Sequence, residues 1–339
     1  MNHRRFAKIG ALSVSLLCLM SAPTVATASG DHRGGYTFAV IGDIPYGDPA
    51  LVTFPQAVEA INDDRRVKLV AHLGDIKSGS TLCSDSYYNT IRENFDHFED
   101  PLVYTIGDNE WTDCHRTNNG AFNPLERLGT VRRTFFDDPG FTLGEHRARV
   151  LSQDRQGYPE NVQFTRQRVS FGAVHIVGSN NGLQPWTNNT QATPEQTAEV
   201  LGRTAAAIQL IRDTFDSAKQ HNHRAVVLMT QADMFDPTVK DPKFADYYAF
   251  QPIVAAIAQE SADFGRPVYL FNGDSHVYNE DAPLAAGSKW VRFYGVDTPV
   301  ANLTRVTVDG AADATEYLRV RINPRRGSVL SWTRVPYGS

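Results

Sequence analysis

The stretch Phe38-Ala-Val-Ile-Gly-Asp43 is a short apolar run that ends in Gly-Asp, and three later runs end in the same way. These are Leu69-Val-Ala-His-Leu-Gly-Asp75, Leu102-Val-Tyr-Thr-Ile-Gly-Asp108 and Val268-Tyr-Leu-Phe-Asn-Gly-Asp274. Apolar runs of this kind, separated by stretches with helical character, are typical of buried strands in a mainly parallel sheet. Because parallel strands finish at one edge of the sheet, we expect the four aspartates to converge in one crevice there.

Carboxylates gathered at one edge repel one another, and each raises the pKa of its neighbours. A bound cation is the usual means of keeping such groups ionised. Gly-Asp can also be ordinary turn chemistry, in which the aspartate caps a helix or starts a turn. Four copies on four similar strands favour a shared metal site over four unrelated turns.

The first 28 residues have the pattern of a secretory signal peptide. A basic start precedes an apolar stretch over 9–20, and Ala26-Thr27-Ala28 is a small-x-small sequence after which we expect cleavage. The apolar stretch is shorter than the about 20 residues that span a bilayer. The sequence therefore predicts a secreted or periplasmic protein with a single domain over 29–339.

The chain is acidic, with 33 Lys and Arg against 38 Asp and Glu and a formal net charge of −5. Removal of the basic leader would make the remainder more acidic still. An acidic chain without a run of Lys and Arg is a poor partner for nucleic acid or an anionic membrane. We therefore expect neither of these partners.

Two cysteines, Cys83 and Cys114, remain after the expected cleavage. An even number of cysteines in an oxidising compartment predicts a disulfide. Each follows a Gly-Asp pair closely, so the bond would join two loops at the predicted metal edge. A reactive thiol is the alternative, but the sequence has no Cys-x-x-Cys motif.

Other patterns predict further elements. Two adjacent strands are expected over 161–170 and 173–177, and Thr193-Pro-Glu-Gln196 marks a helix start with a capping box. Near the C-terminus, alternating apolar and polar residues predict antiparallel strands over 290–294, 303–308 and 318–322. Two sheets packed face to face, with helices outside, would accommodate all of these elements.

From Asp43 to His276 the residues resemble the calcineurin-like metallophosphoesterase superfamily. The family pattern is Asp-x-His, Gly-Asp, Gly-Asn-His-Asp/Glu, a lone His after a strand, and Gly-His-x-His. The corresponding segments are Asp43-Ile-Pro45, Gly74-Asp75, Gly107-Asp108-Asn109-Glu110, Thr230-Gln231 and Gly273-Asp274-Ser275-His276. The resemblance implies an α/β fold, a four-layer α/β/β/α sandwich of two mixed sheets, with a two-metal centre at the strand ends.

The resemblance also implies a set of metal ligands, in which Asp75 bridges the two ions. The other members are Asp43, Asp108, Gln231, Asp274 and His276. Three of the family's ligands are replaced by other oxygen donors, at Asp108, Gln231 and Asp274, whereas Pro45 replaces a ligand histidine and cannot coordinate. Five oxygen donors and one imidazole favour two divalent ions such as Mn, Fe, Mg or Ca over Zn.

Asn109 stands where the family has the histidine that contacts phosphate and assists the leaving group. An amide can hydrogen-bond a phosphoryl oxygen but cannot donate a proton at a useful pKa. His115 is the nearest replacement in the sequence, although it can equally be a loop histidine beside the disulfide, and Arg116 could clamp the phosphate. Tyr46 is expected at the rim of the same edge, and His72, inside a strand, is expected to be structural.

These residues lead to the hypothesis of an exported, metal-dependent phosphoesterase that hydrolyses a small phosphomonoester or phosphodiester by attack of a metal-bound hydroxide. The alternative is a non-catalytic binding protein on a degenerate form of the same scaffold. Loss of the family's histidines at Pro45 and Asn109 favours this alternative. Retention of oxygen donors at Asp108, Gln231 and Asp274 favours the enzyme.

Overall fold

The computed structural model describes residues 35–311, 314–324 and 327–338, together with Met1. The predicted signal peptide, its cleavage site and the predicted start of the domain therefore lie outside the described residues, Met1 apart. The chain divides into the units 1–32 and 33–339, and the fold below is that of the second unit. Within the described part of the chain, no helix combines the length and the hydrophobicity that a membrane span needs.

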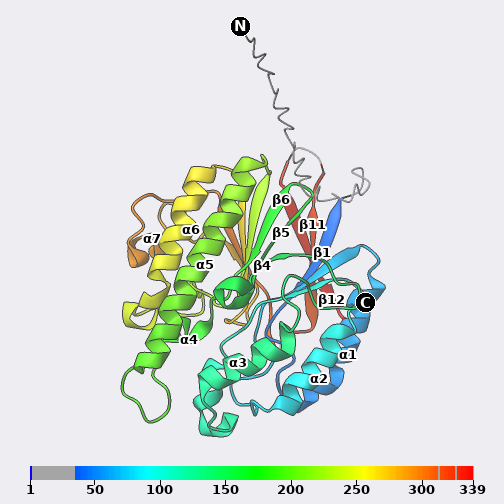
Figure 1. Cartoon of the computed structure of the whole chain (residues 1–339), viewed down its shortest axis with the longest axis vertical. Coiled ribbons are helices and arrows are strands. Elements are labelled where there is room, and N and C mark those ends of the chain that lie inside the picture. Colours follow the sequence, from blue (N-terminus) through cyan, green and yellow to red (C-terminus); the bar gives the residue numbers. More distant parts are fainter. Residues whose placement is uncertain (2–34, 312–313, 325–326, 339) are drawn as a thin grey trace. The chain divides into compact units, whose positions relative to one another are not determined.

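One five-stranded sheet contains three of the Gly-Asp strands and has the order β12-β11-β1-β2-β3. Figure 1 labels three of its members, β1, β11 and β12. Its parallel members are β1 (Tyr36–Ile41), β2 (Val67–His72) and β3 (Leu102–Tyr104). Antiparallel pairing adds β11 (Glu316–Ile322) beside β1 and β12 (Leu330–Pro336) beside β11. The predicted strand over 318–322 is confirmed.

The second sheet has seven strands in the order β4-β5-β6-β7-β8-β10-β9, and β6, β7, β8 and β10 run parallel. The strands are β4 (Leu151–Gln153), β5 (Tyr158–Arg166), β6 (Val169–Ala173), β7 (Ala225–Met229), β8 (Val268–Asn272), β9 (Asn279–Asp281) and β10 (Leu303–Thr307). Both sheets are mixed, as expected.

Helices cover the outer face of each sheet (Figure 1). The first sheet packs against α1 (Gly47–Asp63), α2 (Asp85–Asp96) and α3 (Pro124–Phe135). The second packs against α5 (Pro194–Gln220), α6 (Gln251–Phe264) and α7 (Lys289–Tyr294), and α4 (Gly178–Asn181) is a single short turn. The 3₁₀ turns are η1 (Thr112–His115), η2 (Thr117–Asn119), η3 (Asp154–Gln156), η4 (Phe244–Asp246) and η5 (Tyr248–Phe250).

A third apolar core lies between the two sheets. Phe38 of β1 contacts Phe171 of β6 and Phe271 of β8 edge to face, at centroid distances of 5.5 and 6.1 Å. With helices outside and two sheets inside, the layers are α/β/β/α, and the predicted fold class is confirmed. The capping box is also confirmed, because Thr193 and Gln196 exchange hydrogen bonds where α5 begins.

The predicted strand over 290–294 is wrong, because these residues belong to α7. Ser288 caps the start of this helix, and Gly295 ends it with a left-handed conformation. Aromatic residues that are suited to a strand by propensity here pack as a helical face, since Trp290 contacts Phe293 and Tyr294 at 5.1 and 5.9 Å. The spacings of three and four residues match helical periodicity.

Two other predictions of strands need correction. The strand predicted over 303–308 exists as β10, but it pairs in parallel with β8 and antiparallel with β9, and all but one of its residues are buried. The pair predicted over 161–170 and 173–177 is shifted, because the hairpin turns at Gln167 and Arg168, both with positive φ. The second strand therefore covers 169–173.

Candidate metal centre

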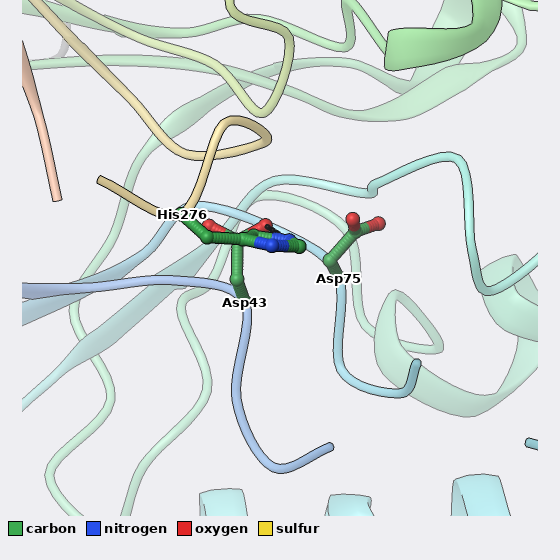
Figure 2. Close-up of side chains that lie close together, drawn as sticks. All are labelled: Asp43, Asp75 and His276. Atoms are coloured by element: carbon green, nitrogen blue, oxygen red, sulfur yellow. Dashed lines mark ion pairs between the residues drawn. The ribbon is translucent and has the colours of Figure 1, made fainter. Parts of the chain in front are cut away.

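The four Gly-Asp sequences meet at one edge of the sheets. Asp43, Asp75 and His276 each offer a ligand atom, and these atoms lie within 4.8 Å of one another (Figure 2). Asp75, Asp108 and Asp274 form a second group with the same property. The expected convergence of the four aspartates is therefore present, and Asp75 is the member that the two groups share.

The backbone at these residues is unusual. The angle φ is 54° at Asp43, 54° at Asp75, 76° at Asp274 and 61° at His276. Few residues other than glycine adopt this left-handed conformation, although aspartate and histidine tolerate it better than most. Such conformations cluster at functional sites, where the surrounding structure holds them. The sharp turn keeps each side chain at the sheet edge, directly after its strand.

Two of the Gly-Asp glycines are required by a neighbouring carboxylate. A Cβ atom at Gly107 would overlap the Asp75 carboxylate, and a Cβ atom at Gly273 would overlap that of Asp43. The connections approach so closely that only glycine leaves room for the acidic group, which follows β2 in the case of Asp75 and β1 in the case of Asp43. This close packing is a physical reason for the recurrence of Gly-Asp in the sequence.

Asp75 accepts hydrogen bonds from several sides. Its Oδ1 accepts from the backbone N–H of Asn109 at 3.1 Å, and its Oδ2 accepts from Nδ2 of the same residue at 2.8 Å. Oδ2 also accepts from the Tyr46 hydroxyl at 3.0 Å and from Nε2 of Gln231 at 3.2 Å. The carboxylate is therefore oriented by residues from three other connections.

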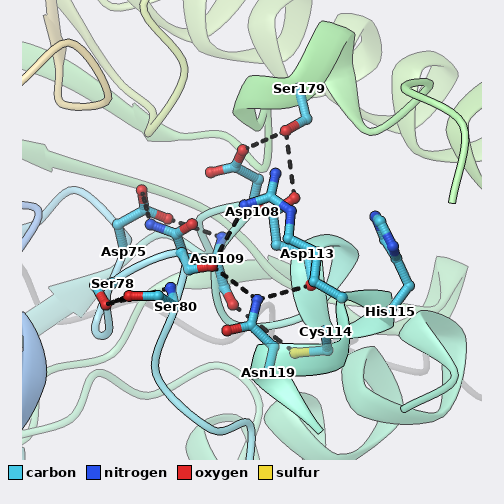
Figure 3. A network of polar contacts seen from close by, with 12 residues as sticks. Asp75, Ser78, Ser80, Asp108, Asn109, Asp113, Cys114, His115, Asn119 and Ser179 are labelled. Atoms are coloured by element: carbon cyan, nitrogen blue, oxygen red, sulfur yellow. Dashed lines mark hydrogen bonds and ion pairs between the residues drawn. The ribbon is translucent and has the colours of Figure 1, made fainter. Parts of the chain in front are cut away.

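A second polar network surrounds Asp108 (Figure 3). The Ser179 hydroxyl donates to Oδ2 of Asp108 at 2.7 Å, and it lies 3.5 Å from Oδ1 of Asp113. Asp113 forms an ion pair with Arg116 at 2.7 Å. This network connects the second metal-capable group to the loop that contains the disulfide.

Burial has the largest effect on the pKa values of the acidic groups at the centre. It raises the pKa of Asp43, Asp75 and Asp274 well above the ordinary aspartate value, and repulsion from Asp108 adds to the rise. Burial and the charge of Asp108 likewise raise the pKa of Asp113 to about 8. The folded chain alone therefore favours protonated carboxyl groups, and cations in place of the protons would stabilise the ionised forms.

A buried layer lies directly behind these groups. Lys77 donates from Nζ to the carbonyl oxygen of Asn109 at 2.7 Å, and burial lowers its pKa to about 8. Oε1 of Glu110 accepts from the Tyr104 hydroxyl at 2.7 Å and from the backbone N–H of Asp75 at 3.2 Å. These contacts hold the backbone at Asp75 and at Asn109.

The three predicted catalytic residues have different surroundings. Asn109 is inside the centre through its contacts with Asp75, and Arg116 lies beside Asn109 around Gly79. His115 is held elsewhere, because its Nδ1 accepts from the backbone N–H of Thr187 at 2.9 Å, and in Figure 3 Asp113 is drawn between its ring and Asn109. Burial, with a contribution from Arg116, lowers the pKa of His115 to about 4. The geometry thus favours the loop role of His115 over a part in catalysis.

Gln231 differs from the expectation for a ligand. Its Oε1 accepts from the backbone N–H of Gly178 at 2.7 Å. Its Nε2 donates to Oδ2 of Asp75 and to Oδ1 of Asp108, both at 3.2 Å. The amide oxygen of Gln231 accepts from the N–H of Gly178, so the amide nitrogen faces the two candidate ligands. In this orientation Gln231 donates hydrogen bonds to them and does not offer them an oxygen.

No protein-family model matches the sequence, and no curated protein matches it. Among solved structures, the chain is similar to GAP50 of Plasmodium, described as the anchor in the inner membrane complex. The TM-score is 0.44, with 8% identity over 89% of both chains.

Two nucleotidases are also similar. The NAD nucleotidase of Haemophilus influenzae has a TM-score of 0.43 and 12% identity, over 89% of this chain and 55% of that one. A 5'-nucleotidase precursor from Thermus thermophilus has a TM-score of 0.43 and 9% identity, over 89% and 54%. The chain thus spans about half the length of these two nucleotidases.

A pocket with a volume of about 400 Å³ opens beside the second metal-capable group. Gly178, Ser179 and Asp274 form its side toward the centre, and Tyr247 and Phe250 supply aromatic surface. Asp274 thus belongs both to the pocket and to the second metal-capable group, and Ser179 connects the pocket to Asp108.

Sequence reasoning missed three contributors to the centre. Tyr46, expected at the rim, contacts Asp75 directly, and Ser179 and Lys77 were not expected at all. Ser179 has a positive φ of 52° within the turn of α4, so its place depends on a loop conformation. A lysine two residues after the Gly-Asp of a buried strand is the one sequence signal, because a buried charge needs partners.

Proposed function

We propose that this chain is a metal-dependent phosphoesterase with ligands at Asp43, Asp75, Asp108, Asp274 and His276. The observation that carries the proposal is the pair of ligand groups that share Asp75. Carboxylate oxygens with a single imidazole suit Mn, Fe, Mg or Ca better than Zn. Gln231, in its present orientation, would steady two of these ligands instead of binding a metal itself.

Charge balance supports two divalent cations. The four aspartates that offer ligand atoms, Asp43, Asp75, Asp108 and Asp274, carry four negative charges once ionised. Two divalent ions carry four positive charges and would balance them. The donor set and the charge therefore fit the same metal content.

Bound cations would polarise a phosphoryl oxygen and lower the pKa of a water molecule for attack on phosphorus. Asp75 would hold both ions in place from its position between the two groups. Arg116 can pair with phosphate, whereas Asn109 would have to exchange its Nδ2 contact with Tyr46 or Asp75 to donate to a phosphoryl oxygen. A Cβ atom at Gly79 would lie 3.0 Å from both Oδ1 of Asn109 and Nη1 of Arg116, so the glycine leaves room for both.

The pocket supports a small substrate. Its volume of about 400 Å³ is in the range of small-molecule sites. A phosphomonoester or a compact phosphodiester could place its phosphoryl group at the carboxylates and its organic part between Asp274 and Tyr247. We also propose that the protein acts outside the cytoplasm, since a disulfide joins Cys83 and Cys114 and such bonds persist in oxidising compartments.

The test is hydrolysis of an aryl phosphomonoester and an aryl phosphodiester by chelator-stripped protein, resupplied separately with Mn, Fe, Mg, Ca and Zn. We expect one of the harder ions to restore turnover and Asp75→Asn to abolish both turnover and most metal binding. Asp263→Asn, an exposed position on α6, is the matched control and should behave as wild type.

Two results would contradict the proposal. Full activity in Asp75→Asn would exclude the shared ligand. Metal binding without hydrolysis of either ester, in folded protein, would favour the non-catalytic binding protein.

A further inference from the structure

We infer that Tyr46 is a positioning residue of the candidate centre, where one hydroxyl sets the relative placement of Asp75, His276 and Asn109. The inference rests on the proposed function. Its basis is the number of separate chain segments that meet at this single oxygen atom.

The Tyr46 hydroxyl has three polar neighbours. It lies 3.0 Å from Oδ2 of Asp75, 3.1 Å from Nε2 of His276 and 2.9 Å from Nδ2 of Asn109. These neighbours follow β2, β8 and β3, and Tyr46 itself follows β1. One oxygen therefore joins all four connections that deliver the Gly-Asp sequences.

Hydrogen-bond chemistry gives each contact a direction. The Asn109 amide has only protons at Nδ2, so it donates to the Tyr46 oxygen. The phenol then has one proton, which it donates to Asp75 or shares with His276. Asn109 also donates to the same Oδ2 of Asp75 at 2.8 Å. Tyr46, Asn109 and Asp75 are thus each hydrogen-bonded to the other two.

The ring of Tyr46 has a separate role from the hydroxyl. It packs edge to face on the His276 ring, at a centroid distance of 5.2 Å and an angle of 89°. The segment before it is fixed from two sides, because Nε2 of His72 hydrogen-bonds the Ile44 carbonyl and the Tyr87 hydroxyl donates to that of Pro45. Phenylalanine would keep the ring contact and this anchoring, and would remove only the three polar contacts.

The first test therefore compares Tyr46→Phe with wild type in Mn²⁺ binding by calorimetry and in hydrolysis of the aryl esters. Loss of a residue that orients metal ligands typically costs 10–100-fold in metal affinity or activity. We expect a loss of about 10–100-fold in Mn²⁺ affinity and a lower kcat, with KM changed less. Circular dichroism verifies that the variant is folded.

Tyr36→Phe is the matched control, because it removes a phenol hydroxyl that donates to the Lys68 carbonyl at the other end of β1. It should bind Mn²⁺ as wild type does. A second test combines Tyr46→Phe with Asn109→Ala. Because the two side chains share a hydrogen bond, the double variant should lose less affinity than the product of the single losses.

Unchanged Mn²⁺ affinity in Tyr46→Phe would overturn the inference and leave the proposed function standing. The inference would also be overturned if the double variant lost Mn²⁺ affinity by the full product of the single losses. That result would mean that the Tyr46 hydroxyl and the Asn109 amide act on metal binding independently. Wild-type protein that binds no cation would overturn the inference and the proposed function together.

Discussion

His72 is a single buried side chain that makes the free energy of unfolding depend on pH. It lies in β2, fully buried, with Nε2 hydrogen-bonded to the Ile44 carbonyl of the loop that leads to Tyr46. Burial lowers its pKa from 6.5 to about 4, so the folded state disfavours the charged imidazole. Its stabilising contribution is therefore complete above pH 6.5 and is lost as the pH falls toward 4.

The variant His72→Gln retains an N–H donor but does not titrate. At pH 5 the wild-type protein should have lost about 2 kcal/mol through this group relative to pH 7.5. The difference in unfolding free energy between the two pH values, measured by urea denaturation with a chelator present, should shrink by that amount in the variant. The exposed His97→Gln is the control. An identical pH dependence in His72→Gln and wild type would contradict the prediction.

At the same scale, the sequence allowed prediction of some site residues and not of others. Asp43, Asp75, Asp108 and Asp274 could be predicted because each directly follows a recognisable strand. Tyr46 could not, since its hydroxyl reaches the centre only through the path of a loop. The amide orientation of Gln231 depends on a backbone N–H 53 residues earlier in the chain, which no local pattern indicates.

Among the elements, the disulfide between the loop before α2 and η1 can be tested directly. Cys83 and Cys114 form the predicted disulfide, with a sequence separation of 31. Their sulfur atoms lie 3.7 and 3.8 Å from the carbonyl oxygen of Asn109, to which Lys77 also donates. The disulfide therefore supports the backbone of a candidate catalytic residue as well as joining two elements.

Replacing both cysteines by alanine should lower the unfolding free energy by about 3–4 kcal/mol, the loop-closure value for this separation. Mn²⁺ affinity should fall as well, because the Asn109 backbone loses one of its supports. Denaturation and calorimetry on the double variant measure the two effects, and reduction of the wild-type protein should reproduce them. Wild-type affinity in a destabilised double variant would show that the bond stabilises the fold without shaping the centre.

Prediction of whole elements succeeded where one periodicity dominated. The Gly-Asp strands and α5 have unambiguous patterns and a clear cap, so their type could be inferred. The segment over 290–294 has aromatic residues that fit either a strand or a helix, and contacts of Trp290 with Phe235 and Tyr247 decide between them. Tertiary packing of this kind overrides local propensity.

At the scale of the whole molecule, metal binding should increase the free energy of unfolding. A cation that binds only the folded state at 100 times its Kd raises the unfolding free energy by about 2.7 kcal/mol. The raised pKa values of Asp43, Asp75 and Asp274 set the pH dependence. In the metal-free protein these groups stabilise the fold while protonated, and this contribution is lost as the pH rises through their raised pKa values.

Protons and cations therefore compete for the same oxygens. At a fixed Mn²⁺ concentration, the gain in unfolding free energy over chelator-treated protein should increase from pH 5 to pH 8. Urea denaturation at pH 5, 6.5 and 8, with Mn²⁺ or with chelator, measures it, and Asp75→Asn should show little gain at any pH. An equal gain at pH 5 and pH 8 would mean that the ion binds away from these carboxylates.

The contact between the Asp274 N–H and the Asp43 carboxylate joins residues 231 positions apart in the chain. Synthesis from the N-terminus would deliver Asp43, Asp75 and Asp108 long before Asp274 and His276 emerge. A nascent chain thus has three acidic turns and no complete ligand group of either kind, because each group needs a residue from the connection after β8. Binding of the proposed metal ions would consequently have to follow synthesis of β8, and the compartment in which folding is completed would determine which ions are available.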